Sequence, residues 1–307
     1  GDFEAALRFT RWRHEQNETS LPWGQLNQPD GGGNEGYAHI DLAYRFDVSD
    51  KLNVRARGYA DHYLYTDTNR YYTSWVCGTA PTPCQQSAPA ENWRYGAEVT
   101  SNLDWFGDGR MATMAGVDAR FLNVFGKTDT FTDDGVQAGT SGYFKKLLDP
   151  AVAVYAQHIA KVSDAIRLNL GVRYDWFSNA DHLSPRAAAI FNAWKGGTLK
   201  AIYSEGFRRP SAYESGFAAP GFEVVAAGLQ PEIVRSVEGV YEQRMGVHLG
   251  KLSVFRTWFS QLIVLGTDPV STLAQYQNAD SIDSVGGNLA YEANFSQLKF
   301  GANVTVS

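Results

Sequence analysis

Apolar and polar side chains alternate along this chain with a period of two over segments of roughly ten residues and more. In one such segment Leu168, Leu170 and Val172 fall on one face, whereas Asn169 and Arg173 fall on the other. This period is that of a β-strand, in which successive side chains point to opposite faces. Strands this long exceed the usual five or six residues of a soluble sheet and match the roughly nine to eleven that cross a bilayer.

The cost of placing a charge in lipid decides which face points outward. One expected strand carries Leu52 and Val54 on one face and Arg55 and Arg57 on the other. An Arg that faces lipid near the bilayer centre costs roughly 2–4 kcal/mol. We therefore expect the apolar face to contact lipid and the charged face to line a lumen. The longest apolar run, near 151–156, is far shorter than the roughly 20 residues of a spanning helix.

The pattern predicts an all-β fold, an antiparallel transmembrane β-barrel that occupies residues 1–307 as one domain. We expect thirteen strands, near 2–12, 37–47, 52–65, 91–104, 110–123, 150–162, 166–177, 184–194, 198–207, 231–245, 250–264, 282–293 and 298–307. Tight turns alternate with mostly long polar loops, which cover 13–36, 66–90, 126–149, 208–230 and 266–281. Outer-membrane barrels show this asymmetry, with short periplasmic turns and long extracellular loops. Because bacterial single-chain barrels have even strand numbers, thirteen predicts a partial barrel.

One segment departs from the alternation. In the expected strand 250–264, Arg256 falls on the same face as Leu252 and Val254. A β-bulge shifts the facing of every later residue in its strand. We therefore expect a bulge or a shifted strand boundary here.

Composition excludes some partners and leaves others open. Aromatic residues make up 13% of the chain, which suits a protein with two membrane–water interfaces and equally a carbohydrate-binding β-domain. The net charge is −6, and no Lys/Arg cluster is long enough to follow a phosphate backbone, so we expect no nucleic acid partner.

The residue types of common reactive centres are scattered. Cys77 and Cys84 lie in a Gly/Pro/Thr-rich segment, where they are either free loop thiols or a disulfide formed in an oxidising compartment. The six histidines show no metal-ligand spacing, and no further ligands flank the two cysteines, so we expect no metal site. No serine stands in a Gly-x-Ser-x-Gly elbow, and no Gly-rich loop is built to hold phosphate. We predict neither an enzyme nor a cofactor-binding protein.

Five short stretches, in order along about 110 residues, resemble motifs of TonB-dependent outer-membrane receptors. They are Gly171-Val172-Arg173-Tyr174-Asp175, Leu183-Ser184-Pro185-Arg186, Gly206-Phe207-Arg208-Arg209-Pro210-Ser211 with Glu214, Leu229-Gln230-Pro231-Glu232 with Glu238, and Tyr276-Gln277-Asn278. Gly286-Gly287-Asn288 departs from the family's usual Gly-x-Glu. The resemblance implies a 22-stranded barrel with a plugged lumen, of which these residues would supply about thirteen strands. The family's plug domain, TonB box and terminal aromatic strand are not among them.

The resemblance also implies a function and a location. A receptor of this family takes up a scarce extracellular ligand, such as a ferric siderophore or another iron chelate, across the bacterial outer membrane. Its partners would be the lipid bilayer, the small ligand and the TonB-ExbB-ExbD complex, which acts through the plug and TonB box. The alternatives are a passive porin, an outer-membrane enzyme, and a surface adhesin or phage receptor.

Aromatic side chains gather in the expected outer loops, where they would form either a ligand platform above the lumen or ordinary girdle and loop packing. These aromatic residues are Trp23, Tyr71, Tyr72, Trp75, Phe144 and Phe222. The charged motif residues either pair with one another, or with a plug, or contact ligand. As candidate ligand-binding residues we take Tyr71, Tyr72, Trp75, Arg208, Arg209 and Tyr213.

Overall fold

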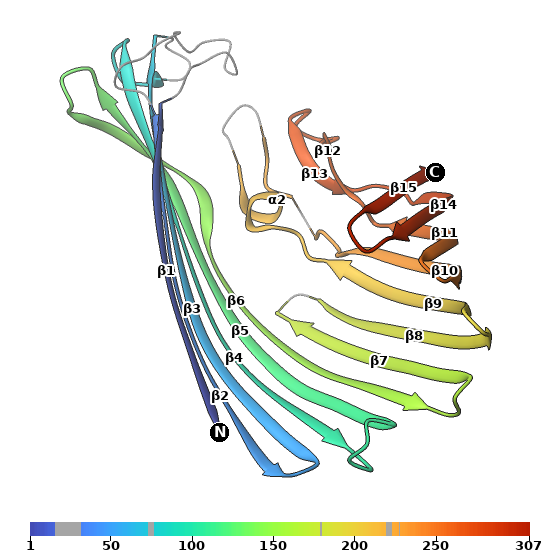
Figure 1. Cartoon of the computed structure of the whole chain (residues 1–307). Coiled ribbons are helices and arrows are strands. Elements are labelled where there is room, and N and C mark those ends of the chain that lie inside the picture. Colours follow the sequence, from blue (N-terminus) through green and yellow to red (C-terminus); the bar gives the residue numbers. More distant parts are fainter. Residues whose placement is uncertain (16–31, 73–76, 179, 219–222, 227) are drawn as a thin grey trace.

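The computed structural model describes the chain outside residues 16–31, 73–76, 179, 219–222 and 227, and leaves the side chains of 14, 15 and 141–146 undescribed. Thirteen strands form one sheet (Figure 1). In sheet order they are β1 (Asp2–Glu15), β2 (Gly32–Ser49), β3 (Leu52–Tyr71), β4 (Cys84–Asp104), β5 (Met111–Thr132), β6 (Gln137–Lys161), β7 (Ile166–Phe177), β8 (Asp181–Trp194), β9 (Gly197–Arg208), β10 (Glu232–Met245), β11 (His248–Ser260), β14 (Ile282–Asn294) and β15 (Lys299–Val306). A separate hairpin pairs β12 (Ile263–Thr267) with β13 (Ala274–Asn278), and α2 (Ala212–Gly216) is a single helical turn.

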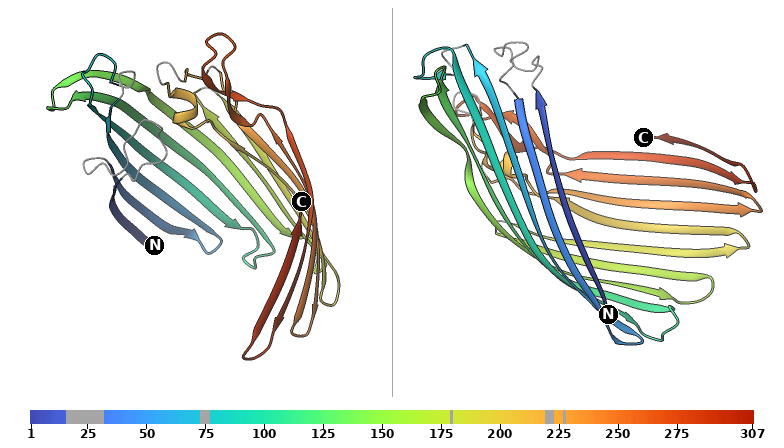
Figure 2. Two further views of the ribbon diagram at one scale, coloured as in Figure 1. Left: turned by 90° about the horizontal axis from the view of Figure 1, so that it is seen from above. Right: turned by 60° about the vertical axis from the view of Figure 1, so that its left-hand side comes forward.

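The sheet follows the order of the chain and curves around a concave face. Each strand of the large sheet pairs antiparallel with its neighbours, and the only departure from chain order among the described strands is that β14 follows β11 directly. Figures 1 and 2 show that α2 and the β12–β13 hairpin lie on the concave side. Within the described residues, β1 and β15 form the two edges of the sheet. The predicted all-β antiparallel fold and its thirteen main strands are confirmed.

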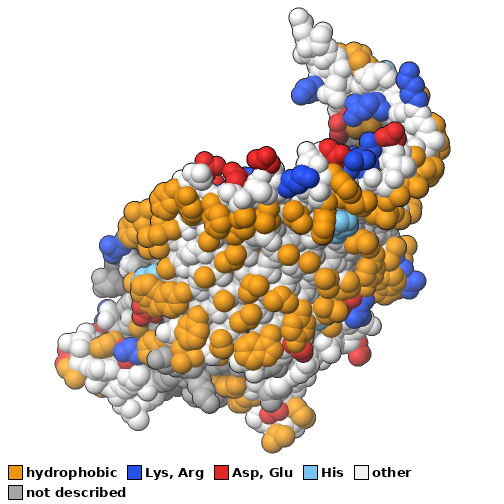
Figure 3. Space-filling model, turned by 90° about the horizontal axis from the view of Figure 1, so that it is seen from below, with side chains coloured by type: hydrophobic (Ala, Val, Ile, Leu, Met, Phe, Trp, Pro, Cys, Tyr) orange, Lys and Arg blue, Asp and Glu red, His pale blue; other side chains and the backbone are white. Residues whose placement is uncertain are grey.

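Exposure along β7 shows which side chains face outward. Leu170 and Val172 are 51% and 44% exposed, whereas Asp175 on the other face is 2% exposed. A soluble protein would bury the first two and expose the third. Figure 3 shows the convex face covered by hydrophobic side chains, with charged side chains gathered toward its margins. The apolar face is therefore the outer one, as the cost of a charge in lipid requires.

Ion pairs within β5 and β7, and between these two strands across β6, occupy the concave face. Arg173 on β7 contacts both Asp175 on its own strand, at 2.8 Å, and Asp118 on β5, at 3.2 Å. Arg120 on β5 contacts the same two carboxylates, each at 3.3 Å. Buried charges are tolerated when they are paired and hydrogen-bonded in this way. Within the described residues, no helix is both long and apolar enough to pass through a membrane.

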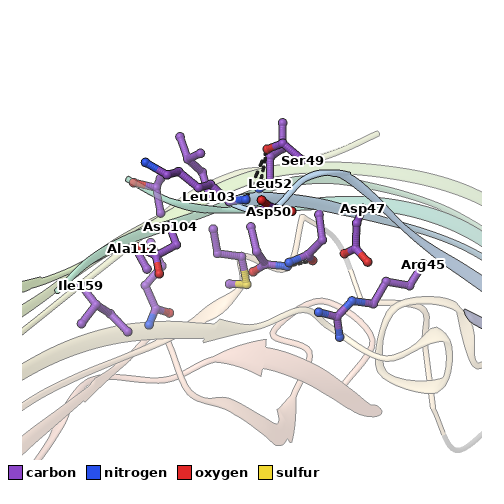
Figure 4. Close-up of a pocket in the computed structure, with 15 residues that line it drawn as sticks. Arg45, Asp47, Ser49, Asp50, Leu52, Leu103, Asp104, Ala112 and Ile159 are labelled. Atoms are coloured by element: carbon purple, nitrogen blue, oxygen red, sulfur yellow. Dashed lines mark hydrogen bonds between the residues drawn. The ribbon is translucent and has the colours of Figure 1, made fainter. Parts of the chain in front are cut away.

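Short turns join strands at one end of the sheet, which we call the turn end. In the β2–β3 turn, the Ser49 hydroxyl accepts hydrogen bonds from the backbone N–H groups of Lys51 and Leu52, at 3.3 and 3.1 Å (Figure 4). In the β4–β5 turn, Asp104 accepts from three backbone N–H groups, two of them at Gly107 and Gly109. Both glycines have positive φ, which a residue with a side chain rarely adopts.

The opposite end, which we call the loop end, differs from the sequence prediction. Strands β3, β4, β5 and β6 extend well beyond the bounds expected for them. The loop predicted at 126–149 is instead the end of the β5–β6 hairpin, closed by a turn between Thr132 and Gln137. The loop predicted at 266–281 contains part of β12 and all of β13, and α2 was not predicted.

Of the two alternatives expected near Arg256, the shifted strand boundary is confirmed and the bulge is wrong. β11 pairs with β10 and with β14 in an unbroken register, although its end at Ser260 comes earlier than expected. Arg256 lies near this loop end of the strand, where its guanidinium contacts Asp283 on β14 at 2.5 Å. The cross-strand ion pair thus accounts for a charge on the apolar face without any break in the alternation.

Candidate functional site

Arg208, Glu214 and Glu232, which we call the rim cluster, join three elements at the loop end. Arg208 ends β9, and two of its guanidinium nitrogens donate to Glu214 of α2 at 2.9 Å each. Its third nitrogen donates to Glu232, the first residue of β10, at 2.5 Å. Glu232 also accepts from the backbone N–H of Ile263 on β12, at 2.7 Å. Such bidentate, charge-assisted contacts fix geometry as well as supplying energy.

A capping box sets the start of α2. The backbone N–H of Glu214 donates to the Ser211 hydroxyl at 3.1 Å, and the backbone N–H of Ser211 donates to the Glu214 carboxylate at 2.7 Å. The hydrogen bonds from Arg208, and then that from Ser211, lower the pKa of Glu214 from 4.5 to about 2. Glu214 is therefore ionised at neutral pH and holds the helical turn against the end of β9.

Asn278 ties the β12–β13 hairpin to the same region. Its side-chain oxygen accepts from the backbone N–H of Gln230 at 2.8 Å. Its amide nitrogen donates to the carbonyls of Gln230 and Gln261, at 2.9 and 2.7 Å. Two residues earlier, the Tyr276 ring meets the Tyr213 ring edge-on, with centroids 6.0 Å apart. The stretches that carry Arg208, Glu232 and Asn278 thus converge on α2 and orient its aromatic side chains.

A cavity of about 560 Å³ lies between α2 and strands β3–β5, and we call it the tyrosine cleft. Tyr213 and Phe217 form one wall, with their rings stacked at 4.4 Å and 15°. Tyr63, Tyr65 and Tyr71 contribute from β3. Small residues leave room for the cavity between these rings, namely Ala88, Ala90 and Gly126.

A disulfide supports one side of the tyrosine cleft. It joins Cys77 to Cys84, with Cα atoms 5.7 Å apart. Both cysteines and Ala80 are buried together, and the Tyr71 ring packs against them. Tyr71 is also the register partner of Cys84 across β3 and β4. The small covalent loop therefore limits where the Tyr71 ring can lie.

A second, more polar cavity of about 540 Å³ adjoins the cleft and shares Tyr63 with it. Arg209 lines this cavity, pairs with the buried Asp149, and places its guanidinium 4.0 Å from the centroid of the Phe177 ring. Arg94 lines it as well and pairs with Asp61 at 2.7 Å. Its cations are held by carboxylates, so the cavity presents balanced charge rather than a positive patch.

A third cavity, of about 600 Å³, lies at the turn end of the sheet (Figure 4). Arg45, Asp47, Asp104 and Ile159 are among the residues that line it. It has none of the stacked aromatic rings found in the tyrosine cleft. Among the residues with a described placement, no group of three or more His, Cys, Asp or Glu side chains could hold a metal ion.

Residues 2–307 match the family described as TonB dependent receptor-like, beta-barrel. The chain belongs to this family. Its members are receptors and transporters of the bacterial outer membrane, and this chain is an outer-membrane β-barrel protein. No curated protein matches the sequence significantly.

Solved structures share the fold at low sequence identity. The copper transporter OprC is 14% identical with a TM-score of 0.71 over 90% of this chain and 47% of its own. The outer membrane transporter YddB from Escherichia coli is 13% identical with a TM-score of 0.65 over 99% of this chain and 45% of its own. The siderophore receptor PirA from Pseudomonas aeruginosa is 15% identical with a TM-score of 0.57, over 98% and 62%. The chain thus spans about half the length of these proteins.

The structure of this TonB-dependent receptor barrel separates the candidate ligand-binding residues. Tyr71 and Tyr213 line the tyrosine cleft together, and Arg209 lines the adjoining polar cavity. Arg208 belongs to the rim cluster, where it pairs with other charged motif residues rather than lining a cavity for ligand. Tyr72 is 41% exposed, lies outside the cleft lining, and has the Arg70 guanidinium 5.7 Å from its ring. Trp23, Trp75, Phe222 and the Phe144 side chain lie outside the described part of the chain.

The sequence-based selection missed several cleft residues of this receptor barrel, above all Tyr63, Tyr65 and Phe217. A signal for the first two was present. Because Arg57 and Asp61 mark the lumen face of β3, every second residue from there on shares that face. Continuing this parity past the expected end of the strand places Tyr63, Tyr65 and Tyr71 in one row.

Proposed function

We propose that this chain forms the barrel wall and ligand-binding vestibule of a receptor for TonB-dependent active uptake of a scarce extracellular ligand. The observation that carries the proposal is the tyrosine cleft, which opens on the concave face at the loop end and is held by the family's motif residues. In this proposal the turn end is periplasmic and the loop end extracellular. An iron chelate of the siderophore type is one candidate ligand.

The complete receptor would contain more than these residues. We propose a barrel of 22 strands whose lumen holds a plug domain, with a TonB box that the TonB-ExbB-ExbD complex engages. The ion pairs that line the concave face offer polar partners to such a plug. Rearrangement of the plug would then open a path along this wall.

The test separates active uptake from a passive porin. A strain that lacks the gene receives the full-length protein, and uptake of radioactive iron is measured with ferric siderophores of the catecholate and hydroxamate types as probes. Uptake of a probe that requires the receptor and is abolished by deletion of TonB supports the proposal. Uptake that persists without TonB, or swelling of proteoliposomes in arabinose, would show an open pore and overturn it.

A further inference from the structure

The tyrosine cleft offers a hydrogen-bond acceptor that the protein itself leaves unused. Asp67 lines the cleft from β3, and one of its carboxylate oxygens accepts from the Asn69 amide at 2.8 Å. The other oxygen is buried and has no hydrogen-bond partner among the described residues. A buried carboxylate oxygen without a partner is costly, so a ligand donor in the cleft that met this oxygen after a rotation of the Asp67 side chain would gain affinity.

The cation at the cleft is already neutralised. Lys127 lines the cleft from β5, and its ammonium contacts the buried carboxylate of Asp129 at 2.5 Å. Asp129 also accepts a hydrogen bond from Thr140 at 2.7 Å. Arg209 beside the cleft is paired with Asp149. An anionic ligand would have to break one of these pairs and would then face Asp67, whereas a neutral or cationic ligand would not.

The shape of the cleft favours a flat group. The Tyr213 and Phe217 rings are stacked on each other, and Tyr71 packs against the disulfide. The small residues Ala88 and Ala90 line the same cleft. Aromatic faces contact flat apolar surfaces, while the tyrosine hydroxyls leave polar edges. Aromatic rings and pyranose sugars both combine a flat apolar face with polar edges.

We infer that the tyrosine cleft recognises a flat group that bears hydrogen-bond donors and no negative charge, with Asp67 as the acceptor. The inference rests on the proposed function, because it names the chemistry of the ligand portion that enters this receptor. It discriminates against a carboxylate or catecholate edge at this position. A ferric siderophore would therefore have to present a neutral or cationic portion to the cleft.

Two matched series of probes test the inference on the full-length receptor in lipid nanodiscs at neutral pH. The aromatic series is benzyl alcohol, benzylamine and benzoate, and the sugar series is methyl glucoside, methyl glucosaminide and methyl glucuronide. Ligand-observed NMR measures binding, and the Tyr213→Ala receptor serves as the blank that removes partition into lipid. The series that binds identifies the flat group as aromatic or saccharide.

Within the series that binds, we expect the neutral and cationic members to bind at least about tenfold more tightly than the anion. Asp67→Asn, which keeps the shape of the side chain, should narrow the ratio of cation to anion affinity by about tenfold. Tyr71→Ala should weaken the neutral probe by about tenfold, whereas the matched control Tyr72→Ala should stay within about twofold. Anion binding as tight as cation binding, equal effects of the two alanine variants, or no binding in either series would overturn the inference.

The binding profile and the uptake assay fail independently. A receptor with the expected charge preference but with uptake that ignores TonB would retain this inference and overturn active transport. A receptor with TonB-dependent uptake and a cleft that prefers anions would retain active transport and overturn this inference.

Discussion

Loss of the charge on Glu214 should release α2 from the end of β9. Glu214 has a pKa of about 2, below its ordinary value of 4.5, because Arg208 and Ser211 donate hydrogen bonds to its ionised form. A carboxyl group with a lowered pKa stabilises the folded state fully above its unfolded value. That contribution is lost as the pH falls from about 4.5 toward 2. Glu214→Gln removes the same charge at neutral pH and leaves a residue that is still accepted in a capping box.

The pKa shift sets the size of the effect. The full lowering of the Glu214 pKa corresponds to at most about 3 kcal/mol of stabilisation of the folded state. The Glu214 side chain is only 15% exposed, but that of Arg208 is 47% exposed, so solvent screens the pair. We therefore expect local opening of α2 to become about 1–2 kcal/mol easier in the variant, which is roughly a 5- to 30-fold larger open population.

Limited proteolysis measures this opening directly. Chymotrypsin cleaves after Tyr213 and Phe217 only when α2 leaves the surface, and cleavage tracks the open population when reclosing is fast. At neutral pH the Glu214→Gln receptor should be cut about 5- to 30-fold faster than the wild type. Glu242→Gln is the matched control, because it removes a different paired carboxylate, on β10, far from α2 in the chain.

Acid provides the second half of this test. With pepsin, cleavage of the wild type should accelerate as the pH falls below about 4.5, while the ratio of variant to wild type shrinks toward one. Equal resistance of the variant and the wild type to chymotrypsin would refute the reasoning. So would a wild-type receptor that opens as the pH rises.

Three further variants test other parts of the structure. Leu170→Arg, on the outer face of β7, should cost roughly 2–4 kcal/mol in urea unfolding from lipid vesicles, while Asn169→Arg on the lumen face should cost less than about 1 kcal/mol. Replacing the disulfide through Cys77→Ser and Cys84→Ser should destabilise the loop end by about 2–3 kcal/mol, seen as faster hydrogen exchange beside Tyr71. Asn278→Ala removes three hydrogen bonds and should speed chymotrypsin cleavage of α2 at least about tenfold.

The strand bounds predicted from the sequence were correct where lipid imposes the alternation of side chains. They were too short where a strand extends beyond the bilayer. Between Leu52 and Asp61 one face must be apolar, so the period of two is clear. From Thr66 to Arg70 both faces are polar, since a strand beyond the bilayer has no reason to be apolar outside. The prediction therefore ended β3 early and took the ends of β5 and β6 for a loop.

The motifs of the candidate site could be predicted from the sequence, whereas the tyrosine cleft could not. A Ser-x-x-Glu pattern at Ser211 and Glu214 is a capping-box signature that a sequence displays directly. The tyrosine cleft depends on which residues meet across strands, such as Tyr71 and Cys84, and on the position of Tyr213 of α2 along the same cleft. These contacts depend on the pairing register of the strands and on the path of a loop. Neither can be derived from the alternation of side chains along one strand.

The placement of the motifs separates two roles within this receptor. The motif residues at the loop end form their hydrogen bonds with one another or with the backbone, as Arg208, Glu232 and Asn278 show. They therefore position α2 and are poorly placed to recognise cargo. Tyr71 and Tyr213 line the cleft but lie outside the motif pattern itself. Changes at positioning residues would disturb binding of every ligand alike. Changes at cleft residues would alter which ligand is preferred, so receptors with the same motifs can differ in cargo without any change in how the loop end is held together.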